Sequence, residues 1–115
     1  MAFINKTISS ALTQVLIPAG SDYPNLNSLR ITNTSPGDSP CKVDLYISSQ
    51  NTGNFYLIKG KMIKAFESMI LDNNSLKFNN KSRKDNLGNE ISFSMNIKLT
   101  DPYSIVTPSV DIIIN

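Results

Sequence analysis

Residues able to do acid–base or nucleophilic chemistry are few in this 115-residue chain, which contains no histidine and a single cysteine, Cys41. Without histidine there can be no Ser-His-Asp or Cys-His arrangement, and the commonest general base and metal ligand at neutral pH is missing. Cys41 opens an expected strand just after a proline turn and has no visible partner base, which indicates a structural thiol. Hydrolytic catalysis of the triad type is therefore excluded.

The carboxylates are scattered rather than grouped. No Asp-x-Asp-x-Asp spacing with a trailing Glu forms a calcium loop, and turn capping or solvated strand faces explain the aspartates better. The segment 35–40 has two prolines and one glycine, unlike a phosphate-binding loop. We therefore expect no enzyme activity, no cofactor and no metal site. The aspartates concerned are Asp38, Asp44, Asp72, Asp85, Asp101 and Asp111.

Two further groups of residues could support binding. Lys77, Lys81, Arg83 and Lys84 form the one local basic cluster, in an Asn-rich stretch without a series of aromatic residues for base stacking. A solvated loop over 80–89 explains the cluster best, and its simplest functional target is an acidic patch on a partner subunit. Tyr46, Phe55 and Tyr56 could form an aromatic platform for a sugar, although alternation sends some of them into the core.

Composition narrows the class of protein. Hydrophobic residues make up 40% and charged residues 17%, with a net charge of +2, so little electrostatic field draws the chain to nucleic acid or an acidic membrane. No apolar segment approaches the roughly 20 residues that span a bilayer, and the first residues do not resemble a signal peptide. We expect one domain, no nucleic-acid partner, no membrane partner and assembly in a reducing compartment.

Alternation of apolar and polar residues predicts β-strands. It is strictest at 90–99, where Ile91, Phe93, Met95, Ile97 and Leu99 share one face. The same period of two marks 41–49 and the C-terminal segment from Val110 to Ile114. Weaker candidates, rich in β-branched or aromatic residues, are 2–8, 12–17, 28–33, 55–59, 62–71 and 75–78.

Turn-forming clusters separate these segments. The pattern predicts an all-β fold, an antiparallel β-sandwich of about eight or nine strands, Ig-like or jelly-roll-like, with residues 1–115 as a single domain. Residues 61–71 also fit a short helix, because their apolar side chains fall at helical spacing, but a strand is favoured. Residues 1–10 either pair into the sheet or form an N-terminal arm that lies on a neighbouring subunit.

Several short strand motifs follow one another between residues 26 and 79. They are Ser28-Leu-Arg-Ile-Thr-Asn-Thr-Ser35, Val43-Asp-Leu-Tyr-Ile47, Phe55-Tyr-Leu-Ile-Lys59, Leu71-Asp-Asn and Leu76-Lys-Phe78. In this order they resemble small structural proteins of tailed bacteriophage virions. The sequence departs from that family at 62–69 and in the loop 80–89. The resemblance implies a non-enzymatic β-sandwich that binds capsid, neck or tail components.

The resulting expectation is a virion structural protein, assembled in the host cytoplasm, that acts as a multicopy assembly, connector or decoration subunit. Its partners would be other virion structural proteins and further copies of itself, contacted through exposed strand edges. The expected interface residues are Phe3, Ile4, Ile8, Lys81, Arg83, Lys84, Val110, Ile112 and Ile114. The alternative is a carbohydrate- or receptor-binding module, with Tyr46, Tyr56 and the loop 51–54 forming a shallow site.

Overall fold

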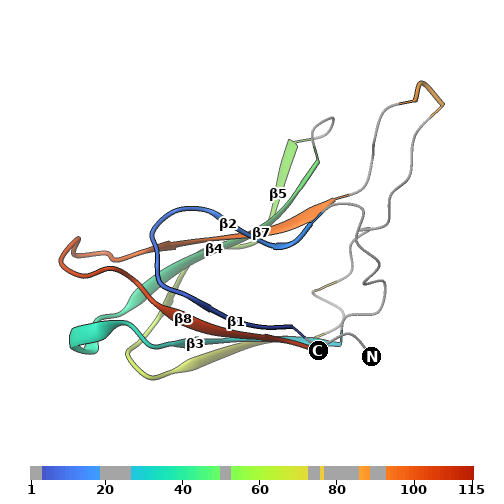
Figure 1. The fold of residues 1–115 in the computed structure, drawn as a ribbon. Coiled ribbons are helices and arrows are strands. Elements are labelled where there is room, and N and C mark those ends of the chain that lie inside the picture. Colours follow the sequence, from blue (N-terminus) through green and yellow to red (C-terminus); the bar gives the residue numbers. More distant parts are fainter. Residues whose placement is uncertain (1–3, 19–26, 50–52, 73–75, 77–85, 89–92) are drawn as a thin grey trace.

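A computed structural model of the chain describes residues 4–18, 27–49, 53–72, 76, 86–88 and 93–115. This part contains eight strands in two four-stranded antiparallel sheets, which pack into a β-sandwich (Figure 1). The strands are β1 (Ile4–Ile8), β2 (Gln14–Ile17), β3 (Ser28–Asn33), β4 (Cys41–Ser49), β5 (Gly53–Ile63), β6 (Ser68–Asp72), β7 (Ser94–Thr100) and β8 (Val110–Ile114), with a short 3₁₀ turn, η1 (Pro36–Asp38). The predicted all-β sandwich is confirmed.

The strand order identifies the topology. One sheet, sheet A, has the order β1-β8-β3-β6, and the other, sheet B, has the order β2-β7-β4-β5. The first strand thus pairs with the last, the second with the seventh, the third with the sixth and the fourth with the fifth. This nested pairing is that of an eight-stranded jelly roll. Of the two expected topologies, Ig-like and jelly-roll-like, the structure has the second.

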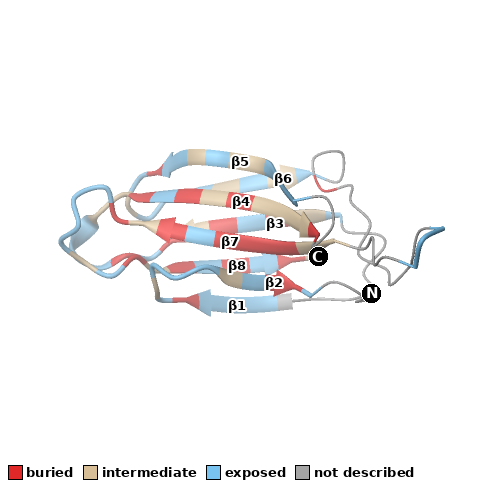
Figure 2. Cartoon of the chain, turned by 90° about the horizontal axis from the view of Figure 1, so that it is seen from above, coloured by how far each residue is buried: buried red, intermediate tan, exposed pale blue. Residues whose placement is uncertain are grey.

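The core fills the space between the sheets because alternate residues of each central strand point inward. Figure 2 shows that the buried residues concentrate on β3, β4, β7 and β8, whereas the edge strands β1, β5 and β6 are mostly exposed or half-buried. Burying each large aliphatic side chain contributes about 1.5–3 kcal/mol. The fully buried ones are Ile17, Leu29, Ile31, Val43, Leu45, Met95, Ile97, Leu99 and Val110, with Ile112 and Ile114 nearly so.

The segment around 62–71 departs from the prediction of one strand. Strand β5 continues from Gly53 through to Ile63, a turn follows at 64–67, and β6 begins at Ser68 on the opposite sheet. The turn contains Phe66 at φ 64°, a left-handed conformation that ends a strand and that an alternation pattern does not signal. The predicted strand 75–78 lies outside the described residues except for Leu76, which is in a turn.

Candidate functional site

The predicted interface residues fall into three groups. Ile4 and Ile8 lie on β1, which forms one edge of sheet A, and residues 4–8 pair with β8 of the same chain. Ile8 is buried and belongs to the core. Phe3 and the basic cluster, Lys81, Arg83 and Lys84, lie outside the described residues.

Val110, Ile112 and Ile114 have a different role from the one expected. Strand β8 lies between β1 and β3, so both of its sides are already paired and it presents no free edge. All three side chains point between the sheets and are buried. Alternation correctly predicted a strand here, but it does not reveal whether a strand is central or at an edge, so their assignment to an edge interface is wrong.

The true edges are β1, β6, β2 and β5, and three of them carry features that oppose pairing with another chain. On β1, Lys6 reaches across to sheet B, where its ammonium donates to the Val15 carbonyl at 3.2 Å and so occupies an acceptor of β2. Strand β2 has only four residues and a register shift between Val15 and Ile17.

The long edge strand β5 is protected by its irregularity. Its register with β4 shifts twice, between Val43 and Leu45 and between Leu45 and Tyr46. Gly60 adopts φ 68° at the first shift, and its N–H donates to the Asp44 carboxylate at 2.7 Å. Bulges of this kind twist an edge away from a flat partner strand.

Strand β6 lacks these features. Its five residues pair with β3 in an unbroken register from Ser28 opposite Asp72 to Thr32 opposite Ser68, and its sequence, Ser-Met-Ile-Leu-Asp, contains no proline and no lysine. Met69 and Leu71 are half-buried and pack against the core, whereas Ile70 is 60% exposed on the outer face. Among the described strands only β3 pairs with β6.

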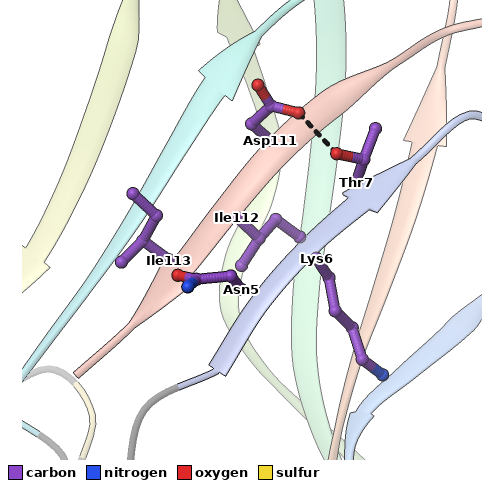
Figure 3. A pocket seen from close by; sticks show the side chains of 6 residues that line it. All are labelled: Asn5, Lys6, Thr7, Asp111, Ile112 and Ile113. Carbon is purple, nitrogen blue, oxygen red and sulfur yellow. Dashed lines mark hydrogen bonds between the residues drawn. The ribbon is translucent and has the colours of Figure 1, made fainter.

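A shallow hollow lies over β1 and β8 on sheet A. It has a volume of about 440 Å³ and is lined by Asn5, Lys6, Thr7, Asp111, Ile112 and Ile113 (Figure 3). Two of its polar side chains, Thr7 and Asp111, are hydrogen-bonded to each other, since the Thr7 hydroxyl donates to the Asp111 carboxylate at 2.8 Å. Lys6 extends away from Thr7 toward β2. The hollow therefore offers few free polar groups to a ligand.

The aromatic residues singled out in the sequence divide between two contacts. Tyr46 and Tyr56 are register partners on β4 and β5, with ring centroids 5.3 Å apart, and the Lys59 ammonium lies 4.0 Å from the centre of the Tyr56 ring. Phe55 instead contacts Phe93 edge to face, with centroids 6.1 Å apart. The structure thus brings the two tyrosines together, as the sugar-platform hypothesis requires, and separates Phe55 from them.

One end of the sandwich is built by four loops, 9–13, 34–40, 64–67 and 101–109, which we call the loop end. The pairing of Asn33 with Val110, Thr32 with Ser68 and Lys42 with Thr100 brings these connections to the same end of the strands. Figure 1 shows them opposite the end that carries the two termini. Ala11 and Ile105 line one hollow of about 390 Å³, so loops 9–13 and 101–109 are neighbours.

Buried polar side chains brace the loop end. The Asn33 side-chain amide donates to the carbonyls of Ser39 (2.9 Å) and Ile63 (3.0 Å), and its oxygen accepts from the Ser35 N–H (2.9 Å). Ser35 in turn accepts from the Ser109 N–H at 3.0 Å. Because Asn33 and Ser35 are both buried, these bonds fix loop 34–40, loop 101–109 and the end of β5 relative to one another.

Asp101 stabilises loop 101–109 through hydrogen bonds from the backbone. Its carboxylate accepts from the N–H groups of Val106 (2.8 Å), Ile105 (2.8 Å) and Tyr103 (3.3 Å). These bonds, led by that from Val106, stabilise the charged form and lower the pKa of the carboxyl group below its ordinary value, although burial opposes the shift. An ionised, buried Asp101 therefore holds loop 101–109 in a defined conformation.

The loop end carries exposed apolar residues that the sequence alone did not bring together. Leu12, Phe66, Tyr103 and Ile105 expose 65–79% of their surfaces there, and we call these four residues the apolar tips. The non-glycine residues with positive φ in the described chain, Asp38, Phe66 and Ser104, also lie in these loops. For Leu12, Tyr103 and Ile105 a signal was present in the sequence, since these apolar residues lie inside Ser-, Thr- and Pro-rich segments, where turn composition alone predicts polar residues. Phe66, in Lys-Ala-Phe-Glu, carried no such signal.

Cys41 behaves as the predicted structural thiol. It is fully buried at the start of β4, and burial raises its pKa to about 11 despite a backbone hydrogen bond from Thr100. Such a thiol is almost entirely protonated at neutral pH and unreactive. Among the described residues, no group of three or more cysteine or acidic side chains lies close enough to hold a metal ion, and none of the helical segments could cross a membrane.

Comparison with protein-family models and with curated protein sequences gives no match. Among solved structures, the Anabaena sensory rhodopsin transducer matches with a TM-score of 0.40 and 15% identity, covering 93% of this chain and 91% of that one. The crystal structure of PirA matches with a TM-score of 0.56 and 10% identity, covering 98% of this chain and 93% of PirA.

The structural similarity to PirA contradicts the resemblance to tailed-phage virion proteins, which no match to a protein-family model or to a curated sequence supports. The motifs that suggested it are built from Val, Ile, Leu and Tyr, which any antiparallel sheet favours, so they indicated β3, β4 and β5 correctly and the family wrongly. The virion localisation and virion partners lose their support with it. At 10% identity, the chain is similar to PirA in fold alone.

Proposed function

We propose that this chain is a non-enzymatic assembly module, present in more than one copy, that associates through protein–protein contacts along β6. The observation that carries the proposal is the contrast among the four sheet edges. Strand β1 carries an inward-reaching lysine, β2 and β5 each carry a register shift, and β6 carries neither. A regular edge strand with an exposed apolar side chain is a template for strand addition.

A second copy of β6 is the partner that fits best. Two antiparallel β6 strands related by a two-fold axis place Ile70 opposite its own copy, Met69 opposite Leu71 and Ser68 opposite Asp72. The half-buried Met69 and Leu71 would be covered by their counterparts, and the exposed Ile70 side chains would pack against each other. Such isologous pairing joins the two copies of sheet A into one continuous sheet.

Light scattering across a concentration series tests this function. We expect dimers that become more populated with concentration, and an Ile70→Lys variant about tenfold weaker in self-association, because it places like charges directly opposite each other. Ile113→Lys is the matched control, since Ile113 and Ile70 both lie next to Arg30 on the same face and only Ile70 is on the edge strand. A monomer at all concentrations, or equal effects of both substitutions, would refute the proposal.

A carbohydrate-binding function is the second candidate, favoured by the contact between Tyr46 and Tyr56 on the exposed face of sheet B. Paired aromatic rings beside polar groups are suited to stacking on a sugar ring. Glycan-array binding that is lost in Tyr56→Ala and retained in Tyr103→Ala would support this function. Lys59 already covers the Tyr56 ring, so a bound sugar would have to displace its ammonium group.

A further inference from the structure

The loop end concentrates exposed apolar surface in an unusual way. Single exposed apolar side chains are common on proteins, but here four large ones, the apolar tips Leu12, Phe66, Tyr103 and Ile105, project from three loops at one end of the sandwich. Phe66 adopts φ 64°, a backbone conformation that is strained for an aromatic residue. Strain that no burial of the side chain compensates indicates a role in binding rather than in folding.

The backbone of the apolar tips is prepared for removal from water. Each of the four N–H groups donates to an acceptor within the protein, whereas exposed loop N–H groups commonly bond to water. The bonds are Leu12 N to Ser10 Oγ (3.0 Å), Phe66 N to Asn33 O (3.2 Å), Tyr103 N to Asp101 Oδ1 (3.3 Å) and Ile105 N to Asp101 Oδ2 (2.8 Å). Moving these residues into an apolar medium therefore leaves none of these donors unpaired.

This arrangement discriminates between two kinds of partner. A protein partner can offer carbonyls and side chains to unpaired loop N–H groups, so an interface with protein does not require every donor to be satisfied beforehand. A lipid bilayer offers no such groups in its hydrocarbon region, and polar backbone groups that enter it must be paired internally. Tyrosine is also well suited to the boundary between hydrocarbon and water.

The charges at the loop end indicate the kind of lipid. The charged side chains of the four loops are Asp38, Lys64, Glu67 and Asp101, one cation against three anions. Attraction to anionic headgroups needs an excess of lysine or arginine near the surface. The loop end lacks that excess, so apolar contact and not electrostatic attraction would provide the binding energy.

From these observations we propose that the loop end docks onto the surface of a neutral lipid bilayer, with the apolar tips entering the interface between headgroups and acyl chains. This surface docking needs no membrane-spanning segment. It departs from the expectation, drawn from the sequence, of no membrane partner. It is also independent of β6 pairing, because sheet A can dimerise at its edge whether or not the loop end binds lipid.

The first test measures partitioning of the full chain onto phosphatidylcholine vesicles by flotation. We expect binding that is not strengthened by phosphatidylserine and is not abolished by high salt. Partitioning should fall about tenfold in Ile105→Ser and in Phe66→Gly, because each variant loses apolar surface that would be buried. Phe66→Gly is the more informative variant, because glycine relieves the left-handed backbone and the protein folds at least as well as wild type. Leu87→Ser is the control and retains binding, because Leu87 is 85% exposed and belongs to the segment 86–88, which Figure 1 draws in orange away from the loop end.

A second test measures insertion itself. The chain contains no tryptophan, so Tyr103→Trp and Leu87→Trp each introduce one fluorescent reporter. We expect the emission at position 103 alone to shift to the blue on adding vesicles and to be quenched by brominated acyl chains. The proposal would be overturned by absence of binding, by binding that requires anionic lipid, or by equal responses of the reporters at 103 and 87. A blue shift at 103 that grows with protein concentration without vesicles would also overturn it, in favour of a protein contact.

Discussion

The carboxylate of Asp101 accepts a hydrogen bond from the backbone N–H of Ile105 at 2.8 Å, which links a buried charge to one of the most exposed apolar side chains in the molecule. The residues are four positions apart, and the N–H groups of Tyr103 and Val106 bond to the same carboxylate. A single ionised group thus determines the shape of loop 101–109.

This arrangement makes the stability of loop 101–109 dependent on pH. Because the folded pKa of Asp101 is lowered, its contribution is complete above the unfolded value of about 3.9 and is lost as the pH falls through the lower folded value. We expect Asp101→Asn to melt at a lower temperature than wild type at neutral pH, and the difference to disappear near pH 2. A difference in melting temperature that stays constant from neutral to acid pH would show that the charge is not responsible.

Asn33 is predicted to be the most sensitive polar position of the loop end. Asn33→Ala removes two donated bonds and one accepted bond in a buried setting and leaves their partners unpaired. Since each unpaired buried group costs about 1–3 kcal/mol, the free energy of unfolding in urea should fall by roughly 3 kcal/mol or more. Asn54→Ala, at an exposed position of β5, is the control and should change it by less than about 0.5 kcal/mol.

Gly60 is predicted to be required by the bulge between β4 and β5. Its φ of 68° is unfavourable for residues with a Cβ atom, and an added Cβ would lie 3.2 Å from the Lys42 side chain. Gly60→Ala should therefore lower the free energy of unfolding by about 1–2 kcal/mol. Gly60→Asn should cost less, because asparagine tolerates this conformation; equal losses would mean that the backbone angle is not the cause.

The sequence predicted the fold to the extent that local pattern determines it. Ser28–Asn33, Cys41–Ser49 and Val110–Ile114 coincide with β3, β4 and β8, since alternation of apolar and polar residues directly reflects a sheet with one buried face. The position of a strand within its sheet depends on pairing between distant segments, which no local pattern encodes. For that reason Val110, Ile112 and Ile114 were assigned to an edge although they belong to the core.

The loop end was missed for a related physical reason. Asn33, Ser35 and Asp101 look like ordinary turn residues in sequence, and only the fold brings them into one hydrogen-bond network. Phe66 looked like part of a strand because its side chain is apolar, yet its backbone is in a turn. The sequence singled out Tyr46 and Tyr56 together, and the structure pairs them, because both residues have apolar neighbours in expected strands that are close in the sequence.

Cys41 should be unreactive toward thiol reagents in the folded protein. Its full burial and its pKa of about 11 keep it protonated and inaccessible at neutral pH. We expect an aromatic disulfide reagent to modify one thiol in urea and almost none in buffer, at a rate set by unfolding. Rapid modification in buffer would contradict the placement of Cys41 in the core.

This protection of Cys41 allows the most direct test of the proposed association along β6. In the two-fold antiparallel arrangement, residue 70 lies opposite its copy at a Cα separation of about 4.5–5.5 Å, which is within the range of a disulfide. We expect Ile70→Cys to form a covalent dimer under mild oxidation, while Ile113→Cys, on the paired strand β8, stays monomeric under the same conditions. Failure of Ile70→Cys to cross-link, or cross-linking of both variants at the same rate, would contradict association through β6.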